Sequence, residues 1–153
     1  MFTKLCFPEY DFKFKKEKEK ILIFDEIRIK WIVCTPEEWV RQNLLKYLII
    51  ELNFPKNFVA IEKSIVLAGR TLRFDALIYN KEFQPFVIIE CKAPNVNITQ
   101  NTFDQILNYN YEVGAKYFLI TNGLTLIMGK IDKNKNVVFC KEMLNYETLL
   151  IND

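Results

Sequence analysis

The sequence predicts an α/β (α+β) fold with the element order α-β-β-β-α-β-β after an N-terminal β extension. Two segments carry apolar residues at helical spacing behind clear start signals, and the segments around them alternate or run apolar as strands do. The chain has 153 residues, half of them hydrophobic. This length suits one ordinary domain with a sizeable core, so we expect a single domain over residues 1–153.

The first part of the chain is predicted to form a β-hairpin or meander over residues 10–34. Tyr10, Phe12 and Phe14 alternate with charged residues, and the apolar run 21–24 follows. The charged stretch "KKEKEK" at 15–20 could be a basic patch, but its interleaved glutamates favour a solvated hairpin tip. We expect an extension at 1–27, a core at about 28–131 and a C-terminal strand and short helix at 132–153.

The first helix is predicted to begin in "TPEEWVRQNLLKYLIIELNFP". Thr35 suits the N-cap, Pro36 the first helical position, and Glu38 completes a capping box with Thr35. The helix is expected to end before Pro55. Its core face should contain Val40, Leu44, Leu48 and Leu52, which recur every four residues.

The remaining elements follow from turn signals and apolar runs. Three strands are expected at 58–67, 71–79 and 86–92, with a tight turn at 68–70. A second helix should run from Thr99 or Thr102 to about Glu112 and end at Gly114. Its apolar side should contain Phe103, Ile106, Leu107, Tyr111 and Val113. Strands at 116–121, 124–131 and 137–139 should follow, with turns at 122–123 and 133–136 and a short helix within 143–151.

Composition excludes several classes of function. The net charge of +2 gives no basis for nucleic-acid binding through bulk charge. The chain has no histidine, and its four cysteines are far apart, which argues against a zinc site and against Ser-His or Cys-His catalysis. We find no signal peptide and no apolar run of the roughly 18 residues that a membrane span needs. We therefore expect a cytoplasmic protein with reduced thiols.

Charged residues lie inside two of the predicted strands. Asp75 precedes the run Ala-Leu-Ile, and Glu90 and Lys92 close the run 86–89. If these strands are antiparallel neighbours, Asp75 meets Glu90 across the pair, and burial adds to their repulsion. A protonated carboxyl, an intervening cation such as Lys92 or a bound metal ion would each relieve this cost. Carboxylate oxygens suit Mg²⁺ or Mn²⁺, held by Asp75, Glu90 and the backbone carbonyl of Cys91.

The pattern of Asp75 followed by Glu90-Cys91-Lys92 resembles the D…(D/E)xK signature of the PD-(D/E)xK nuclease superfamily, with Phe74 in place of the usual proline. That resemblance implies a restriction-endonuclease-like αβββαβ core, with a mixed central sheet flanked by helices. The segments "TPEEWVRQ", "VIIECKAP", "DQILNYN" and "LITNG" further resemble the N-terminal nuclease domain of type I restriction enzyme R subunits. The resemblance runs from about residue 28 to 131 and implies a Mg²⁺-dependent endodeoxyribonuclease, with Mn²⁺ as a substitute.

The resemblance also implies roles for residues on the two helices. Glu38, or else Glu37, corresponds to an acidic residue that supports the metal site, although the capping box alone explains Glu38. Gln105 and Tyr109 match a QxxxY motif whose side chains face the site; a second capping box with Thr102 and ordinary packing are the alternatives. Three further residues are candidates for nucleic-acid binding, namely Arg41, Gln42 and Arg73. Arg41 and Gln42 could instead hold Glu38, and Arg73 could instead form an ion pair.

Two hypotheses for function remain open. The first is metal-dependent hydrolysis of DNA in restriction, defence or DNA processing, directed by a restriction-modification or helicase partner or by pairing with a second copy. The second is a non-catalytic module that binds nucleic acid or a partner protein. The chain has no GxxxxGK[ST] phosphate loop, so it lacks the ATP-driven part of type I restriction. A β-rich scaffold without a ligand would leave the charges in the strands unexplained.

Overall fold

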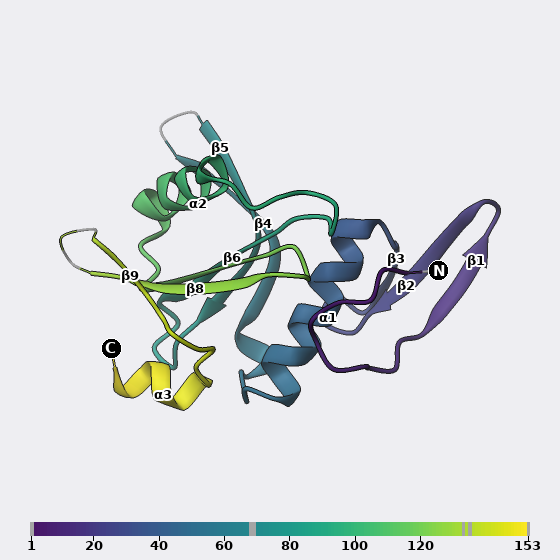
Figure 1. Cartoon of the computed structure of the whole chain (residues 1–153), viewed down its shortest axis with the longest axis horizontal. Helices are drawn as coiled ribbons and strands as arrows, with labels where there is room; N and C mark the ends of the chain where they lie inside the picture. Colours follow the sequence, from purple (N-terminus) through teal and green to yellow (C-terminus); the bar gives the residue numbers. More distant parts are fainter. Residues whose placement is uncertain (1, 68–69, 133, 135, 153) are drawn as a thin grey trace.

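The computed structural model describes residues 2–67, 70–132, 134 and 136–152 (Figure 1). Within these residues the chain forms two β-sheets. The smaller one is an antiparallel sheet of β1 (Phe14–Glu17), β2 (Lys20–Asp25) and β3 (Lys30–Val33), in that order. It lies at one end of the molecule, beside the first helix (Figure 1).

The larger sheet has six strands in chain order. They are β4 (Val59–Leu67), β5 (Arg70–Tyr79), β6 (Pro85–Cys91), β7 (Tyr117–Thr121), β8 (Leu126–Ile131) and β9 (Val137–Phe139). β6 and β7 pair in parallel and the other neighbours pair antiparallel, so the sheet is mixed. A parallel pair requires a crossover connection, which here contains the second helix.

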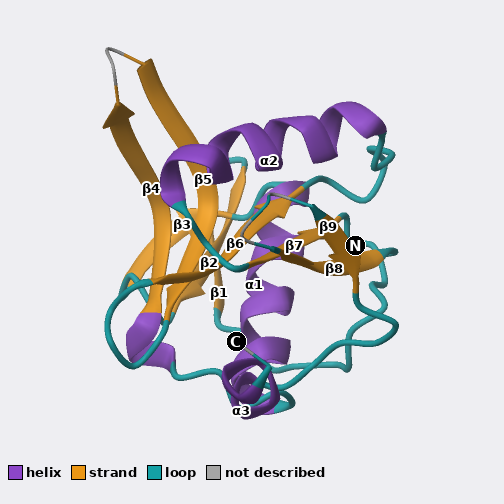
Figure 2. Ribbon diagram, turned by 90° about the vertical axis from the view of Figure 1, so that its left-hand side faces the viewer, coloured by secondary structure: helices purple, strands orange, loops and turns teal. Residues whose placement is uncertain are grey.

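Helices cover both faces of this sheet (Figure 2). α1 (Pro36–Ile50) and the short α3 (Tyr146–Ile151) share one core with every second residue of the central strands, whereas α2 (Gln100–Val113) packs on the other face. Side chains alternate along a strand, so neighbouring residues of β6 belong to different cores: Val87 and Ile89 face α1, and Ile88 faces α2. A 3-10 turn (Lys56–Phe58) precedes β4.

The small sheet packs against α1 through apolar and aromatic side chains. Ile23 is fully buried. The ring of Trp39 on α1 stacks on Phe2 at 4.7 Å and meets Phe12 edge-on at 5.2 Å, and its indole N–H donates to the Thr3 carbonyl at 3.0 Å. These contacts hold the N-terminal segment and the sheet against the first two turns of α1.

The structure confirms the mixed α/β fold and most of the predicted elements. Val40, Leu44 and Leu48 are buried as expected, and Gly114 ends α2 at φ +74°, a left-handed backbone that favours glycine. The β meander predicted over residues 10–34 is present as β1 to β3, which end at Val33. The prediction that Tyr111 lies on the apolar side of α2 was wrong, since its side chain is 66% exposed.

Two further predictions concern turns and the membrane. Residues 68 and 69 of one predicted turn, and 133 and 135 of the other, lie outside the described residues. Asn122 accepts hydrogen bonds from the N–H groups of Leu124 and Thr125 at 3.0 and 2.9 Å, which forms the predicted turn before β8. Across the described part of the chain, no helix is long and apolar enough to cross a bilayer.

Candidate active site

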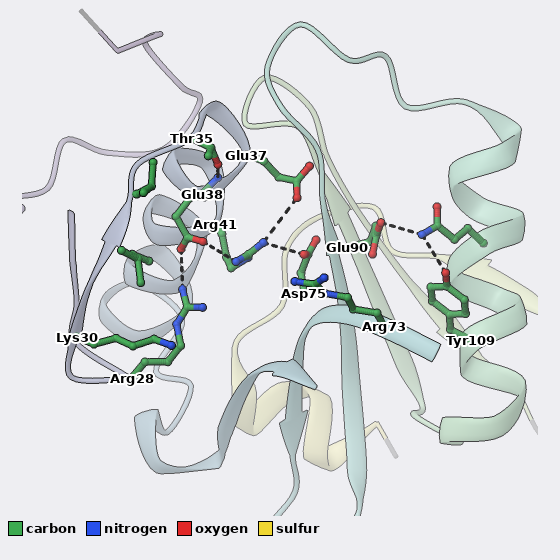
Figure 3. Close-up of a pocket in the computed structure, with 13 residues that line it drawn as sticks. Arg28, Lys30, Thr35, Glu37, Glu38, Arg41, Arg73, Asp75, Glu90 and Tyr109 are labelled. Carbon is green, nitrogen blue, oxygen red and sulfur yellow. Dashed lines mark hydrogen bonds and ion pairs between the residues drawn. The ribbon is translucent and has the colours of Figure 1, made fainter. Parts of the chain in front are cut away.

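A cavity of about 630 Å³ lies beside β5, β6 and the N-terminal half of α1 (Figure 3). Five elements supply its walls: β3 and α1 on one side, β5 and β6 along the floor, and α2 on the other side. Among the residues predicted to form a site, the lining contains Glu38, Arg41, Arg73, Asp75, Glu90, Gln105 and Tyr109. Residues far apart in the sequence therefore share one concave surface.

The register of β5 and β6 places the two central carboxylates side by side. Ala76 pairs with Ile89, so the next residues on each strand are Asp75 and Glu90. Directly opposed residues of antiparallel strands project from the same face, and both side chains line the cavity. As the alternation along the two strands predicted, both acidic side chains therefore line the same cavity.

The Asp75 carboxylate is held by two donors. Its Oδ2 accepts a hydrogen bond from the backbone N–H of Cys91 at 2.5 Å, and its Oδ1 accepts one from Nη2 of Arg41 at 2.9 Å. The first bond ties the side chain to the neighbouring strand, and the second ties it to α1. Both oxygens thus have defined positions although the side chain is 15% exposed.

Glu90 has a different set of partners. Its Oε1 accepts from Nζ of Lys92 at 2.6 Å and from Nε2 of Gln105 at 3.2 Å, and Gln105 also donates to the Tyr109 hydroxyl at 3.4 Å. Burial and the nearby charge of Asp75 raise the pKa of Glu90 above its ordinary value, against the lowering effect of Lys92. Burial would lower the pKa of Lys92, but its bond to Glu90 and the surrounding acids raise it, so the ammonium stays charged.

The alternative explanation for Gln105 is wrong. The N-cap of α2 is Thr99, whose N–H donates to Thr102 Oγ1 at 3.3 Å, so Thr102 lies inside the helix. A capping box of Thr102 with Gln105 is therefore absent, and the Gln105 amide instead reaches Glu90 one layer away. Lys92 does not line the cavity and reaches the site through Glu90.

Glu38 also departs from the capping box. Its N–H donates to Thr35 Oγ1 at 3.1 Å as expected, but the Thr35 N–H donates to the Val33 carbonyl. The Glu38 carboxylate is buried among Arg28, Arg41 and Gln42, at 3.0, 2.6 and 2.9 Å. Glu37 lines the same cavity and is half-exposed; burial and then the charge of Asp75 raise its pKa.

Asp25, at the end of β2, belongs to this network and was not predicted. Arg28 Nε donates to it at 2.5 Å, the Ile27 and Arg28 N–H groups at 2.8 Å each, and Gln42 Nε2 at 2.9 Å. Burial alone would raise the pKa of Asp25, but the hydrogen bonds and charge of Arg28 hold it below its ordinary value. The sequence carries one signal for it, a carboxylate at the end of an apolar strand.

The predicted nucleic-acid contacts are placed differently from one another. Gln42 is 5% exposed and donates its amide to Asp25 and Glu38 inside the protein, which is at odds with a role at the surface. Arg41 is equally buried and joins Glu38 to Asp75. It therefore holds Glu38, which is one of the two roles predicted for it. Arg73 is exposed and lines the cavity near Asp75 (Figure 3).

The donor set fits a hard divalent cation in its chemistry. Asp75 and Glu90 offer carboxylate oxygens from adjacent strands, and burial and then the charge of Asp75 raise the pKa of Glu90, a cost that a bound cation would relieve. Within the described residues, no group of three or more Asp, Glu, Cys or His side chains is arranged to hold a metal ion. A cation here would therefore rely on two carboxylates supplemented by backbone oxygen and water.

Comparison with solved structures shows the fold. A fragment of a putative HsdR subunit of a type I restriction enzyme from Vibrio vulnificus superposes with a TM-score of 0.58 and 17% identity, over 77% of this chain and 25% of that one. The type IIG restriction endonuclease BpuSI also matches, with a TM-score of 0.36 and 18% identity, over 76% of this chain and 14% of that one. This chain thus spans a quarter or less of those proteins.

Comparison with protein families gives a closer assignment, although no curated protein matches the chain. The model described as "Type I restriction enzyme R protein N terminus (HSDR_N)" matches residues 36–143. This region contains α1, the six-stranded sheet and α2, and therefore every residue of the cavity except those before the helix. The chain belongs to the family of type I restriction enzyme R protein N-terminal domains.

Proposed function

We propose that this protein hydrolyses phosphodiester bonds of DNA with the help of a divalent cation. The observation that carries the proposal is that Asp75 and Glu90 follow the paired residues Ala76 and Ile89 of β5 and β6 and line one open cavity, with the Lys92 ammonium behind them, 2.6 Å from Glu90. A cluster whose acid has a raised pKa and a specific cationic partner is typical of catalytic sites.

Asp75, Glu90 and the carbonyl of Cys91 would hold Mg²⁺ or Mn²⁺. Such an ion, when bound, supplies an activated water and neutralises charge on the phosphate. The Cys91 N–H and Arg41 orient Asp75, and Gln105, itself bonded to Tyr109, orients Glu90. These contacts keep the carboxylates in place before substrate arrives, which lowers the cost of organising the site.

Lys92 is the group proposed to act on the reacting atoms. Its raised pKa keeps the ammonium protonated at neutral pH. A fixed positive charge beside the cavity can position the attacking water or stabilise charge that develops on phosphorus, both of which act mainly in the transition state. Membership of the R-subunit family supports a role in a restriction system, in which other subunits would direct the domain to DNA.

The test compares Lys92→Ala with Glu90→Ala in a plasmid-nicking assay and in calorimetric titration with Mn²⁺. Lys92→Ala should retain Mn²⁺ binding and lose about 10²–10³-fold in hydrolysis, whereas Glu90→Ala should lose both. Lys141→Ala and Glu147→Ala, on exposed positions elsewhere, serve as matched controls. If wild type shows no metal-dependent hydrolysis of any DNA or RNA, alone or with neighbouring gene products, the non-catalytic module is the better account.

A further inference from the structure

One wall of the cavity comes from outside the matched family region. Lys30, Ile32 and Val33 of β3 line the cavity opposite Tyr109 of α2, whereas the family match begins at residue 36 (Figure 3). β3 is the edge strand of the small sheet. The N-terminal extension therefore shapes the opening through which any substrate must approach Asp75 and Glu90.

Lys30 is the cation on this wall that faces substrate space without an internal carboxylate partner. It is exposed, and no ion pair involving it occurs within the described residues. Arg28 and Arg41 also line the cavity, but both are bound to buried carboxylates, at 2.5 Å to Asp25 and 2.6 Å to Glu38. An exposed ammonium beside an open cavity is suited to binding an anion that enters from solvent.

Two more lysines lie on the opposite face of the sheet, since Lys30 pairs with the buried Asp25 whereas the next residue, Trp31, pairs with Phe24. Lys15 lies opposite Leu22, which lies opposite Val33, so Lys15 and the cavity-lining Val33 share a face. Lys15 Nζ lies 4.9 Å from the ring centre of Trp31, and Lys13 Nζ lies 5.7 Å from that of Phe24. Lys15 pairs with Glu17 at 2.6 Å, but both are exposed, so this pair is weak and readily exchanged.

Charge is unevenly distributed along the chain. Residues 13–33 contain seven basic and four acidic residues, a net charge of +3, compared with +2 for all 153 residues. One acidic and one basic member of this set, Asp25 and Arg28, neutralise each other in the interior. The exposed part of the small sheet therefore carries the net positive charge of the protein, beside the cavity.

We propose that the N-terminal sheet binds the phosphate backbone of a nucleic-acid strand that leads into the cavity, with Lys30 at the cavity and Lys15 and Lys13 further out. Lys13 and Lys15 lie at the rings of Phe24 and Trp31, and lysines beside aromatic rings are typical of sequence-independent binding to strands, which would pass the β3 edge to reach Lys30. The proposal rests on the proposed function for the direction of the strand, but the binding itself requires neither metal nor cleavage.

The test measures binding in EDTA, with the full chain, by fluorescence anisotropy. The probes are short fluorescein-labelled strands of mixed sequence: single-stranded DNA, duplex DNA, single-stranded RNA and duplex RNA. The variant is the triple Lys13→Ala, Lys15→Ala, Lys30→Ala. The control triple replaces Lys56, Lys81 and Lys141, which are exposed and also include one surface ion pair, that of Lys81 with Glu147. Melting curves are measured to check that both triple variants are folded.

The sheet triple should bind at least about tenfold more weakly at low salt, and its log–log salt slope on single strands should fall by about two, since each lost phosphate contact removes about 0.7. The control triple should match wild type. The probe that loses most affinity identifies the strand type. Equal weakening by both triples, or no binding of any probe by wild type, overturns the proposal.

Two further outcomes separate this proposal from neighbouring ones. If wild type binds strands through these lysines but never cleaves them, the nuclease proposal fails and the binding surface stands. If light scattering shows a dimer that Ile29→Asp abolishes, and the sheet triple leaves strand binding unchanged, the sheet serves a second copy of the chain and the proposal is overturned. Ile29 is 76% exposed and does not line the cavity, so this variant leaves the site intact.

Discussion

Two acidic clusters lie on either side of Arg41, and they differ in how well their charge is compensated. Asp25 and Glu38, between the small sheet and α1, receive hydrogen bonds from Arg28, Gln42 and Arg41 and are almost fully buried. Burial is outweighed there, and the pKa of Asp25 is lowered. Asp75 and Glu90, on β5 and β6, have fewer donors, and burial raises the pKa of Glu90.

This difference separates a structural network from the candidate functional site. In the first cluster the hydrogen bonds and charge of Arg28 outweigh the burial of Asp25, so ionisation of Asp25 stabilises the fold. In the second cluster ionisation of Glu90 costs stability, which the fold tolerates only because other contacts hold it in place. A group kept in an unfavourable charge state is available to bind a cation or to exchange a proton.

The largest expected effect is on the first cluster. Asp25→Ala leaves the Arg28 guanidinium without its closest carboxylate in a buried position, and we expect a loss of about 3–5 kcal/mol in unfolding free energy. Urea denaturation measures it. Glu147→Ala, which removes an exposed ion pair with Lys81, should cost less than about 1 kcal/mol. Similar losses for the two variants would show that the Asp25 cluster is not the structural one.

Arg41 should couple unequally to the two acids of the second cluster, Asp75 and Glu90. It contacts Asp75 at 2.9 Å, whereas Glu90 is held by Lys92 and Gln105. A double-mutant cycle of Arg41→Ala with Asp75→Ala should give a coupling free energy of about 1–3 kcal/mol, measured by urea denaturation. The parallel cycle of Arg41→Ala with Glu90→Gln should be additive within about 0.5 kcal/mol. Equal couplings would mean that Arg41 holds Asp75 and Glu90 alike, which would contradict these contacts.

The smallest effect, with the opposite sign, is expected at Glu90. Its folded-state pKa lies above its unfolded value, so the ionised form costs the fold stability at pH above that folded pKa, and the cost disappears as pH falls below the unfolded pKa. Glu90→Gln should therefore raise the melting temperature in EDTA at neutral pH, and the gain should vanish at acidic pH. A melting temperature below that of wild type at neutral pH would contradict this assignment.

The sequence predicted the parts of the site that depend on local spacing. Strand parity placed Asp75 beside Glu90, and the four-residue spacing placed Gln105 and Tyr109 on one helix face; the cavity contains all four. The signal that identified Glu90, an acid after an apolar run, also occurs at Asp25. Only the structure distinguishes them, because Arg28 and Gln42 reach Asp25 through the packing of a separate sheet on α1.

The same limit explains why the sequence did not predict that β3 forms one wall of the cavity. Residues 30–33 have an ordinary strand pattern, and nothing in their spacing indicates that they approach α2 and β6 in space. Arg41 and Gln42 follow Glu38 on α1 and could be assigned either to Glu38 or to solvent. Their burial depends on the position of β2, which is a tertiary contact that local periodicity does not encode.

One tryptophan of the chain lies in α1, where the N-terminal segment packs on it, and the other lies in the small sheet. Trp39 is stacked on Phe2, and Trp31 lies under the Lys15 ammonium with Phe24 at its edge. Tryptophan emission therefore reports on the small sheet and its contact with α1, whereas far-ultraviolet circular dichroism reports on the whole backbone. Detachment of the extension would change this emission, and a nucleic-acid strand that lies across Lys15 would change the emission of Trp31 without any added label.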